Sequence, residues 1–116
     1  MPYITQSRKS RLEGKVLEAC DAAAKLFANS IVIPRSSKSV KQIIEDACSR
    51  GFSSVIILSR RADAVEASIL RIRSLGSSYS WGRSYGLDCK DNKVSVYNEN
   101  EQNDAEKEFI KEAQDD

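Results

Sequence analysis

The chain has 116 residues, 41% of them apolar and 30% charged, with a formal net charge of +1, a size that supports one domain with one modest core. Its run of four apolar residues at 55–58 is far too short to span a bilayer, and the N-terminus shows no secretory or lipid-anchoring signal, so we expect a cytosolic protein. The lack of histidine excludes Ser-His-Asp and Cys-His catalysis and, with three widely spaced cysteines, disfavours a metal site.

The first strand and the first helix are predicted from local patterns. Residues 3–5 are apolar and β-prone enough for a short strand, which a polar loop follows. Ser10 and Glu13 fit the S-x-x-E capping box, in which the two side chains satisfy backbone N–H groups at the start of a helix. The helix would stop at Asn29 in a left-handed conformation. Its apolar stripe comprises Val16, Cys20, Ala23 and Phe27.

Two continuously apolar runs indicate strands that are covered on both faces. Residues 31–33 predict a central strand that Pro34 ends, and residues 53–59 predict the next strand. Between them a second helix ends near Gly51, and its apolar stripe comprises Val40, Ile43, Ile44 and Ala47. The order strand-helix-strand-helix-strand predicts a parallel βαβαβ unit.

The second half of the chain predicts antiparallel strands and a C-terminal helix. After a turn-like break at residues 60–63, residues 67–72 alternate as a half-exposed strand that pairs with the preceding one. Residues 93–97 predict a final strand, and residues 105–113 a short, weakly docked helix. Together with the βαβαβ unit, these elements predict an α/β fold of the α+β sandwich type.

Charge is segregated along the chain. Residues 1–93 hold 16 Lys and Arg against 9 Asp and Glu, a net +7, whereas residues 94–116 hold 2 against 8, a net −6. We expect a single domain at residues 1–98 and an acidic tail at residues 99–116 that can contain the short helix. This layout is compatible with binding a polyanion through the basic body, and also with a solvated surface that has an ordinary acidic end.

Three segments of the N-terminal half carry motifs of a known family. Residues 4–10, Ile-Thr-Gln-Ser-Arg-Lys-Ser, match an opening strand and a T-S-R-[KR]-P loop, with Gln6 at the position of Thr and Ser10 where proline is usual. Residues 33–39 match a strand that ends in an R-G-x-x-S turn, and residues 43–58 match the helix, glycine and apolar strand that follow it. With these motifs, residues 3–72 resemble the Brix-domain family of ribosome-biogenesis factors, particularly its short archaeal members.

The resemblance implies a function and a fold. Family members bind ribosomal RNA during ribosome assembly, on a fold akin to the anticodon-binding domains of class II aminoacyl-tRNA synthetases. They are usually longer than this chain, with a second half that repeats the first. The remainder of this chain is too short and too acidic for a full repeat.

Cations follow the predicted strands and mark a candidate phosphate site. In a parallel βαβαβ unit the loops that follow the strands meet at one edge of the sheet. The N-termini of the helices also point their free N–H groups to this edge. The candidate RNA-binding residues are Ser7, Arg8, Lys9, Arg11, Arg35, Ser37, Lys38, Arg60 and Arg61. Reading of bases would need stacking on aromatic side chains, and the candidates are Tyr79, Trp81 and Tyr85. The alternative roles are solubility for the cations and sheet packing for the aromatic residues.

Two other functions stay open at this point. An enzyme could use the same strand ends as a small-anion pocket, although no glycine-rich nucleotide motif supports it; its side chains would be Asp63, Glu66 or Cys89. A protein-interaction adaptor could dock its tail on a basic partner or fold it back over the basic loops, through Glu106, Glu108 and Glu112. The favoured expectation is an RNA-binding protein with RNA and ribosome-assembly proteins as partners, and without catalytic residues, metal or cofactor.

Overall fold

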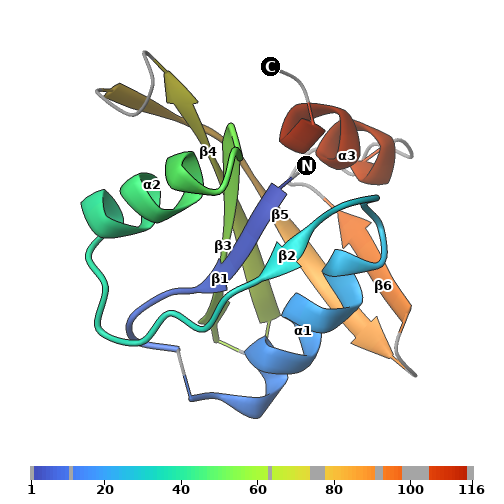
Figure 1. Ribbon diagram of the computed structural model, residues 1–116. Helices are drawn as coiled ribbons and strands as arrows, with labels where there is room; N and C mark the ends of the chain where they lie inside the picture. Colours follow the sequence, from blue (N-terminus) through green and yellow to red (C-terminus); the bar gives the residue numbers. More distant parts are fainter. Residues whose placement is uncertain are drawn as a thin grey trace.

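A six-stranded mixed sheet carries helices on both faces in the computed structural model (Figure 1), which describes residues 2–10, 12–62, 64–73, 78–90, 93–97 and 105–114. The strand order is β2-β1-β3-β4-β5-β6. The predicted α/β fold is confirmed. The elements are β1 Pro2–Gln6, α1 Gly14–Ala24, β2 Ile31–Val32, α2 Val40–Ser49, β3 Ser54–Arg61, β4 Ala64–Arg73, β5 Ser78–Lys90, β6 Lys93–Tyr97 and α3 Ala105–Gln114.

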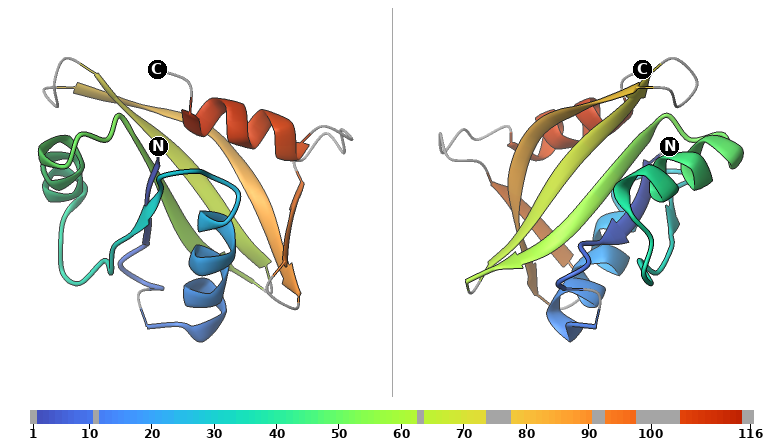
Figure 2. Two further views of the ribbon diagram at one scale, coloured as in Figure 1. Left: turned by 45° about the vertical axis from the view of Figure 1, so that its right-hand side comes forward. Right: turned by 90° about the vertical axis from the view of Figure 1, so that its left-hand side faces the viewer.

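The sheet separates two hydrophobic clusters. Helices α1 and α3 pack on one face, whereas α2 packs on the other (Figure 2). Side chains alternate between these faces along each strand, so Ile56 of β3 points toward α1 while its neighbour Ile57 belongs to the cluster under α2. This two-sided burial explains the continuously apolar sequence of β3.

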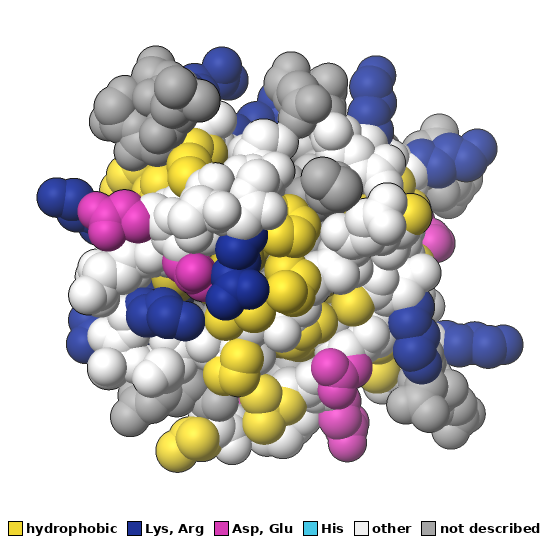
Figure 3. Space-filling view, viewed as in Figure 1, with side chains coloured by type: hydrophobic (Ala, Val, Ile, Leu, Met, Phe, Trp, Pro, Cys, Tyr) yellow, Lys and Arg dark blue, Asp and Glu magenta, His cyan; other side chains and the backbone are white. Residues whose placement is uncertain are grey.

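The central strand of the parallel part of the sheet is not the predicted one. Residues 31–33 were expected to form a central strand, but β2 is a two-residue edge strand that pairs with β1 alone. The fully buried strand β1 takes the inner place, with β2 on one side and β3 on the other. The apolar run at Ile31 is only half-buried, because α2 and α1 cover the edge incompletely. Figure 3 shows a band of hydrophobic side chains at the surface between the places that α1 and α2 occupy in Figure 1.

Strands β3 to β6 form an antiparallel meander, which confirms the predicted pairing of β4 with β3 and the predicted strand at residues 93–97. Strand β5 was not predicted from the sequence. The turn after β3 contains Ala62 in a left-handed conformation, with φ of 56°, and Asp63 lies outside the described residues. Strand β5 is long, and its pairing with β4 shifts register between Ser68 and Leu70. The strand β6 pairs only with the second half of β5, from Gly86 to Lys90.

Helix α1 does not use the predicted capping box. It begins at Gly14 after Glu13, and no side chain caps it. The Ser10 hydroxyl instead accepts a hydrogen bond of 3.0 Å from the backbone N–H of Arg60, because the end of β3 lies beside this loop. The helix ends at Ala24, earlier than predicted, although Asn29 does adopt the left-handed conformation, with φ of 60°. The predicted apolar stripe is buried.

Helix α2 confirms its prediction closely. Ser39 caps the backbone N–H of Gln42, and the Gln42 side chain accepts from the backbone N–H of Ser39. Gly51 follows the helix with φ of 85°, a conformation that favours glycine. The two central apolar residues, Ile43 and Ile44, are buried against the sheet.

Helix α3 packs firmly on the sheet, so the prediction of weak docking was wrong. Phe109 is fully buried and makes edge-to-face contacts with Phe27 at 5.7 Å and with Tyr85 at 5.2 Å between ring centroids. Ala105 and Ala113, one turn or so to each side, are buried as well. The Ser54 hydroxyl also donates to the carbonyl of Ala113. Within the described segments, no helix has the length and apolar character needed to cross a membrane.

Candidate nucleic-acid interface

Gln6, the last residue of β1, ties the loop after β1 to the loop after β2. Its buried side-chain oxygen accepts the backbone N–H of Arg35 at 2.9 Å, and its backbone carbonyl accepts from Arg35 Nη1 at 3.0 Å. Its amide nitrogen contacts the Cys20 Sγ of α1 at 3.5 Å. Burial raises the pKa of the Cys20 thiol to about 11, so this cysteine packs as a small apolar side chain. The two loops therefore lie side by side, as the parallel topology predicts.

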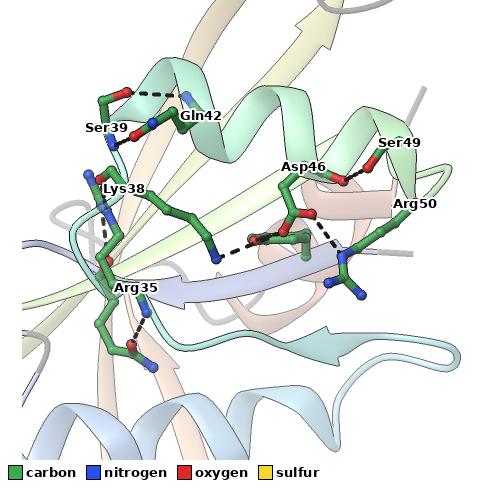
Figure 4. Close-up of polar contacts among 9 residues, drawn as sticks. Arg35, Lys38, Ser39, Gln42, Asp46, Ser49 and Arg50 are labelled. Atoms are coloured by element: carbon green, nitrogen blue, oxygen red, sulfur yellow. Dashed lines mark hydrogen bonds and ion pairs between the residues drawn. The ribbon is translucent and has the colours of Figure 1, made fainter.

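Arg35 is part of this loop framework. Its side chain is only 4% exposed, and its Nε donates to the carbonyl of Lys38 at 2.8 Å (Figure 4). Burial, followed by the charge of Arg8, lowers the pKa of Arg35. Arg35 thus stabilises the loop between β2 and α2. Its guanidinium is less accessible to a ligand than the sequence suggested.

Asp46 of α2 gathers cations of the same region (Figure 4). Its carboxylate accepts from Tyr3 Oη at 2.6 Å and from Arg50 Nε at 3.1 Å, and it lies 4.0 Å from Lys38 Nζ. The Tyr3 hydrogen bond, and then Arg50 and Lys38, hold the pKa of Asp46 below its usual value. Burial and the bond to Asp46 raise the pKa of Tyr3. Lys38 is therefore directed toward α2.

We expect replacement of Asp46 with asparagine to weaken the dependence of the free energy of unfolding on pH in the acid range. Folding favours the carboxylate, so its contribution is complete above the ordinary pKa and is lost as pH falls through the lowered folded-state pKa. The free energy of unfolding of the wild type should exceed that of the variant by about 1 kcal/mol near neutral pH, and this difference should disappear as the pH falls below the ordinary pKa of an aspartate and through the lowered pKa of Asp46. Urea unfolding across this range measures it. Asp21→Asn, on an exposed part of α1, is the matched control; a gap that stays constant with pH would contradict the assignment.

Five of the predicted residues line one depression of about 420 Å³. We call it the cationic groove, and it is lined by Ser7, Arg8, Lys9, Arg35 and Arg60 together with Trp81. Arg8, Lys9 and Arg60 are exposed. The Arg60 guanidinium also donates through Nε to the carbonyl of Ala62 at 3.1 Å, and its Nη1 lies 3.8 Å from Glu13 Oε2. The Ser7 hydroxyl oxygen is buried and has no hydrogen-bond partner among the described residues. The loops after β1 and β2 and the end of β3 thus contribute cations to one surface.

The other predicted phosphate-binding residues that the structure describes do not line the groove. Arg61 is turned toward β4, where its Nη1 lies 2.9 Å from a carboxylate oxygen of Glu66. Ser37 is exposed in the loop before α2. Arg11, which was predicted to join the site, lies outside the described residues. The groove is therefore smaller than the predicted patch, and it centres on the ends of β1 and β3.

The three aromatic candidates divide into an exposed pair and a buried residue. Trp81 and Tyr79 are 52% and 48% exposed, and their rings meet edge to face at 6.3 Å. Trp81 pairs with Leu70, which belongs to the cluster under α2, so the indole emerges on that face. Tyr85 is only 1% exposed, and packing against Phe109 makes it a core residue, contrary to its predicted stacking role.

The described part of the acidic tail does not cover the cationic groove. Helix α3 lies against β4 and β5, where Glu112 accepts hydrogen bonds from the Arg83 backbone N–H at 2.7 Å and from Tyr85 Oη at 2.8 Å. Burial and this bond raise the pKa of Tyr85. The cations that α3 meets were missed by the sequence interpretation. The signal for them was the alternation Leu-Arg-Ile-Arg at residues 70–73, which places both arginines opposite the α2 face.

Comparisons with known proteins show a shared fold. No protein-family model matches this chain, and no curated protein sequence matches it either. A crystal structure of a probable ribosomal biogenesis protein from Aeropyrum pernix K1 is similar, with a TM-score of 0.65 and 12% sequence identity. The match covers 76% of this chain and 48% of that one, so the match spans about half of that protein's length. At this identity the likeness establishes the fold alone.

Proposed function

We propose that the protein binds ribosomal RNA during ribosome assembly in the cytoplasm, as a Brix-type factor that acts beside other assembly proteins. The observation that carries this proposal is the cationic groove, in which exposed cations from the loop after β1 and from the end of β3 lie in the same depression as an exposed indole. The fold shared with a probable ribosomal biogenesis protein supports it, as do the motifs at residues 4–10 and 33–39. The proposed role involves binding without a catalytic step.

The groove suits a single strand better than a duplex. Arg8, Lys9 and Arg60 would hold phosphates, which positions a strand without reading its sequence. The buried Ser7 hydroxyl could donate a further hydrogen bond once a phosphate oxygen is near. Trp81 and Tyr79 present ring faces and edges on which unpaired bases can stack. We therefore expect preference for unpaired regions and little preference for base identity.

The proposal is tested by replacing the three exposed cations of the groove with alanine, in the variant Arg8→Ala, Lys9→Ala, Arg60→Ala. Each phosphate contact on a single strand contributes about 0.7 to the slope of log affinity against log salt, so the slope should fall by up to about 2. Affinity for a single-stranded ribosomal RNA fragment at low salt should fall at least about tenfold. Fluorescence anisotropy in a salt series measures both quantities.

The control removes the same charge at exposed positions that do not line the groove, in the variant Lys25→Ala, Lys90→Ala, Lys93→Ala. The variant Trp81→Ala should weaken binding by about 1–3 kcal/mol for each stacked base without changing the salt slope. Equal losses in the groove variant and the control would mean non-specific attraction only. Absence of RNA binding by the wild type would overturn the proposal.

A further inference from the structure

A second cationic depression, of about 710 Å³, lies between α3 and strands β4 and β5. We call it the α3 cleft. It is on the face of the sheet opposite α2, where α3 runs beside β5 (Figure 2). Its basic lining comprises Arg71, Arg73, Arg83 and Lys111, with the Ser80 hydroxyl and Trp81 beside them. None of these cations belongs to the cationic groove.

The carboxylates of the α3 cleft are already held by protein donors. Glu112 accepts from the Arg83 backbone N–H and from Tyr85 Oη, and Glu108 lies 3.6 Å from Arg83 Nη1. Gly82 makes room for this arrangement, because a Cβ at that position would lie 2.0 Å from Glu112 Oε1. The two acidic side chains are thus fixed in the wall of the cleft and turned toward their own donors.

Donors remain at the mouth of the cleft. Arg73 and Lys111 are exposed, and Arg73 Nε is 3.3 Å from the Ser80 hydroxyl. Arg71 donates through Nη2 to the carbonyl of Glu112 at 3.1 Å, while its buried Nε has no hydrogen-bond partner within the described segments. A group with several anionic oxygens would be recognised by this set, because arginine, lysine and hydroxyl donors all bind phosphate.

The free half of β5 connects this cleft with the cationic groove. Since β6 pairs with β5 only from Gly86 onward, the described residues place no strand beside the outer edge of Ser78–Ser84. Trp81 lies in this half and lines both depressions. A chain that leaves the groove on the α2 face can therefore pass over the Tyr79 and Trp81 rings and around this edge to the other face.

We propose that the α3 cleft is a second phosphodiester-binding site, reached by the same single strand of RNA that occupies the cationic groove. The inference rests on the proposed function and extends it: one RNA strand wraps around the free half of β5. Phosphates bind Arg8, Lys9 and Arg60 at the ends of β1 and β3, and Arg73, Lys111 and Ser80 in the α3 cleft. The exposed aromatic pair at the edge stacks the bases between the two sites.

The test is the variant Arg73→Ala, Lys111→Ala, measured with single-stranded RNAs of about 4 and about 12 nucleotides, one at the short end and one well inside the usual range of site sizes. The longer RNA should lose about tenfold or more in affinity, and its salt slope should fall by up to about 1.4. The shorter RNA, which fills only the groove, should change less than about twofold. The control Lys25→Ala, Lys90→Ala should leave both affinities near those of the wild type, and circular dichroism verifies the fold of each variant.

The outcomes separate this inference from the proposed function. If the longer RNA binds the Arg73→Ala, Lys111→Ala variant like the wild type while the groove variant is weakened, the α3 cleft is excluded and the groove stands. If only the Arg73→Ala, Lys111→Ala variant is weakened, the cleft is supported and the groove is excluded as the RNA site. If the wild type binds neither RNA, both proposals are overturned.

Discussion

Replacement of Phe109 with alanine should lower the free energy of unfolding by about 3–5 kcal/mol, the usual loss for a large buried aromatic residue. The Phe109 ring is fully buried between Phe27, in the segment that follows α1, and Tyr85 of β5, so it joins α3 both to the sheet and to this segment. Helix α3 has ten residues, too few for stable helix formation without packing. Its order therefore depends on this contact. Urea unfolding monitored by circular dichroism measures the loss.

Lys107→Ala, at an exposed position of the same helix, is the control and should change the free energy of unfolding by less than about 0.5 kcal/mol. If Phe109→Ala lowers the free energy of unfolding by less than about 1 kcal/mol, the helix is weakly docked, as the sequence indicated. Detachment of α3 would also dismantle the α3 cleft. In the Phe109→Ala background, adding Arg73→Ala and Lys111→Ala should therefore no longer lower the affinity for the longer RNA.

A second large effect is expected at Gln6, although this residue carries no charge. Replacement with alanine removes the acceptor for the buried backbone N–H of Arg35 and leaves a small cavity beside Cys20. An unsatisfied buried donor and a cavity together should cost about 2–4 kcal/mol in the free energy of unfolding. The folded variant should also bind RNA more weakly, because Gln6 positions the loops that bear Arg8 and Arg35. Chemical denaturation and anisotropy measure the two effects.

Gln42→Ala provides the comparison, since it removes an exposed glutamine whose side chain bonds only at the start of α2. It should cost no more than about 1 kcal/mol, the usual range for a helix-capping contact, and leave RNA affinity unchanged. Equal destabilisation by the two substitutions would show that the bonds between Gln6 and Arg35 contribute little to holding the loops together.

Local sequence patterns predicted most of the sheet and helix α2. The apolar stripe and terminal glycine of α2 act within one helix, and strands β3 and β4 are neighbours in the chain. Features that depend on distant partners were predicted poorly. Ser10 and Glu13 have the spacing of a capping box, yet the Ser10 hydroxyl accepts a hydrogen bond from the backbone N–H of Arg60 instead. Whether residues 31–33 form a central or an edge strand depends on where β1 pairs, which no local pattern specifies.

The candidate site divides in the same way. The strand-end rule identified Arg8, Lys9 and Arg60 because it depends only on parallel topology. It could not foresee that Arg35 would be buried by hydrogen bonds to Gln6 and Lys38. The α3 cleft was missed because it exists only where α3 docks. The acidic tail suggested a segment that can fold back over the basic loops. Instead, three buried residues of α3 hold this helix on the sheet, where it forms one wall of the α3 cleft.

The mixed topology of the sheet has a consequence for the order in which the protein folds. Strands β3 to β6 pair with their neighbours in sequence and can form early, because short loops close at little entropic cost. Strand β1 pairs with β3 across two helices and a further strand, so its pairing involves a far more distant closure. We expect the meander to form first and β1 to enter the sheet late. The cationic groove, built on the ends of β1 and β3, would then be among the last features to form, and a nascent chain would acquire its RNA-binding surface only when folding is nearly complete.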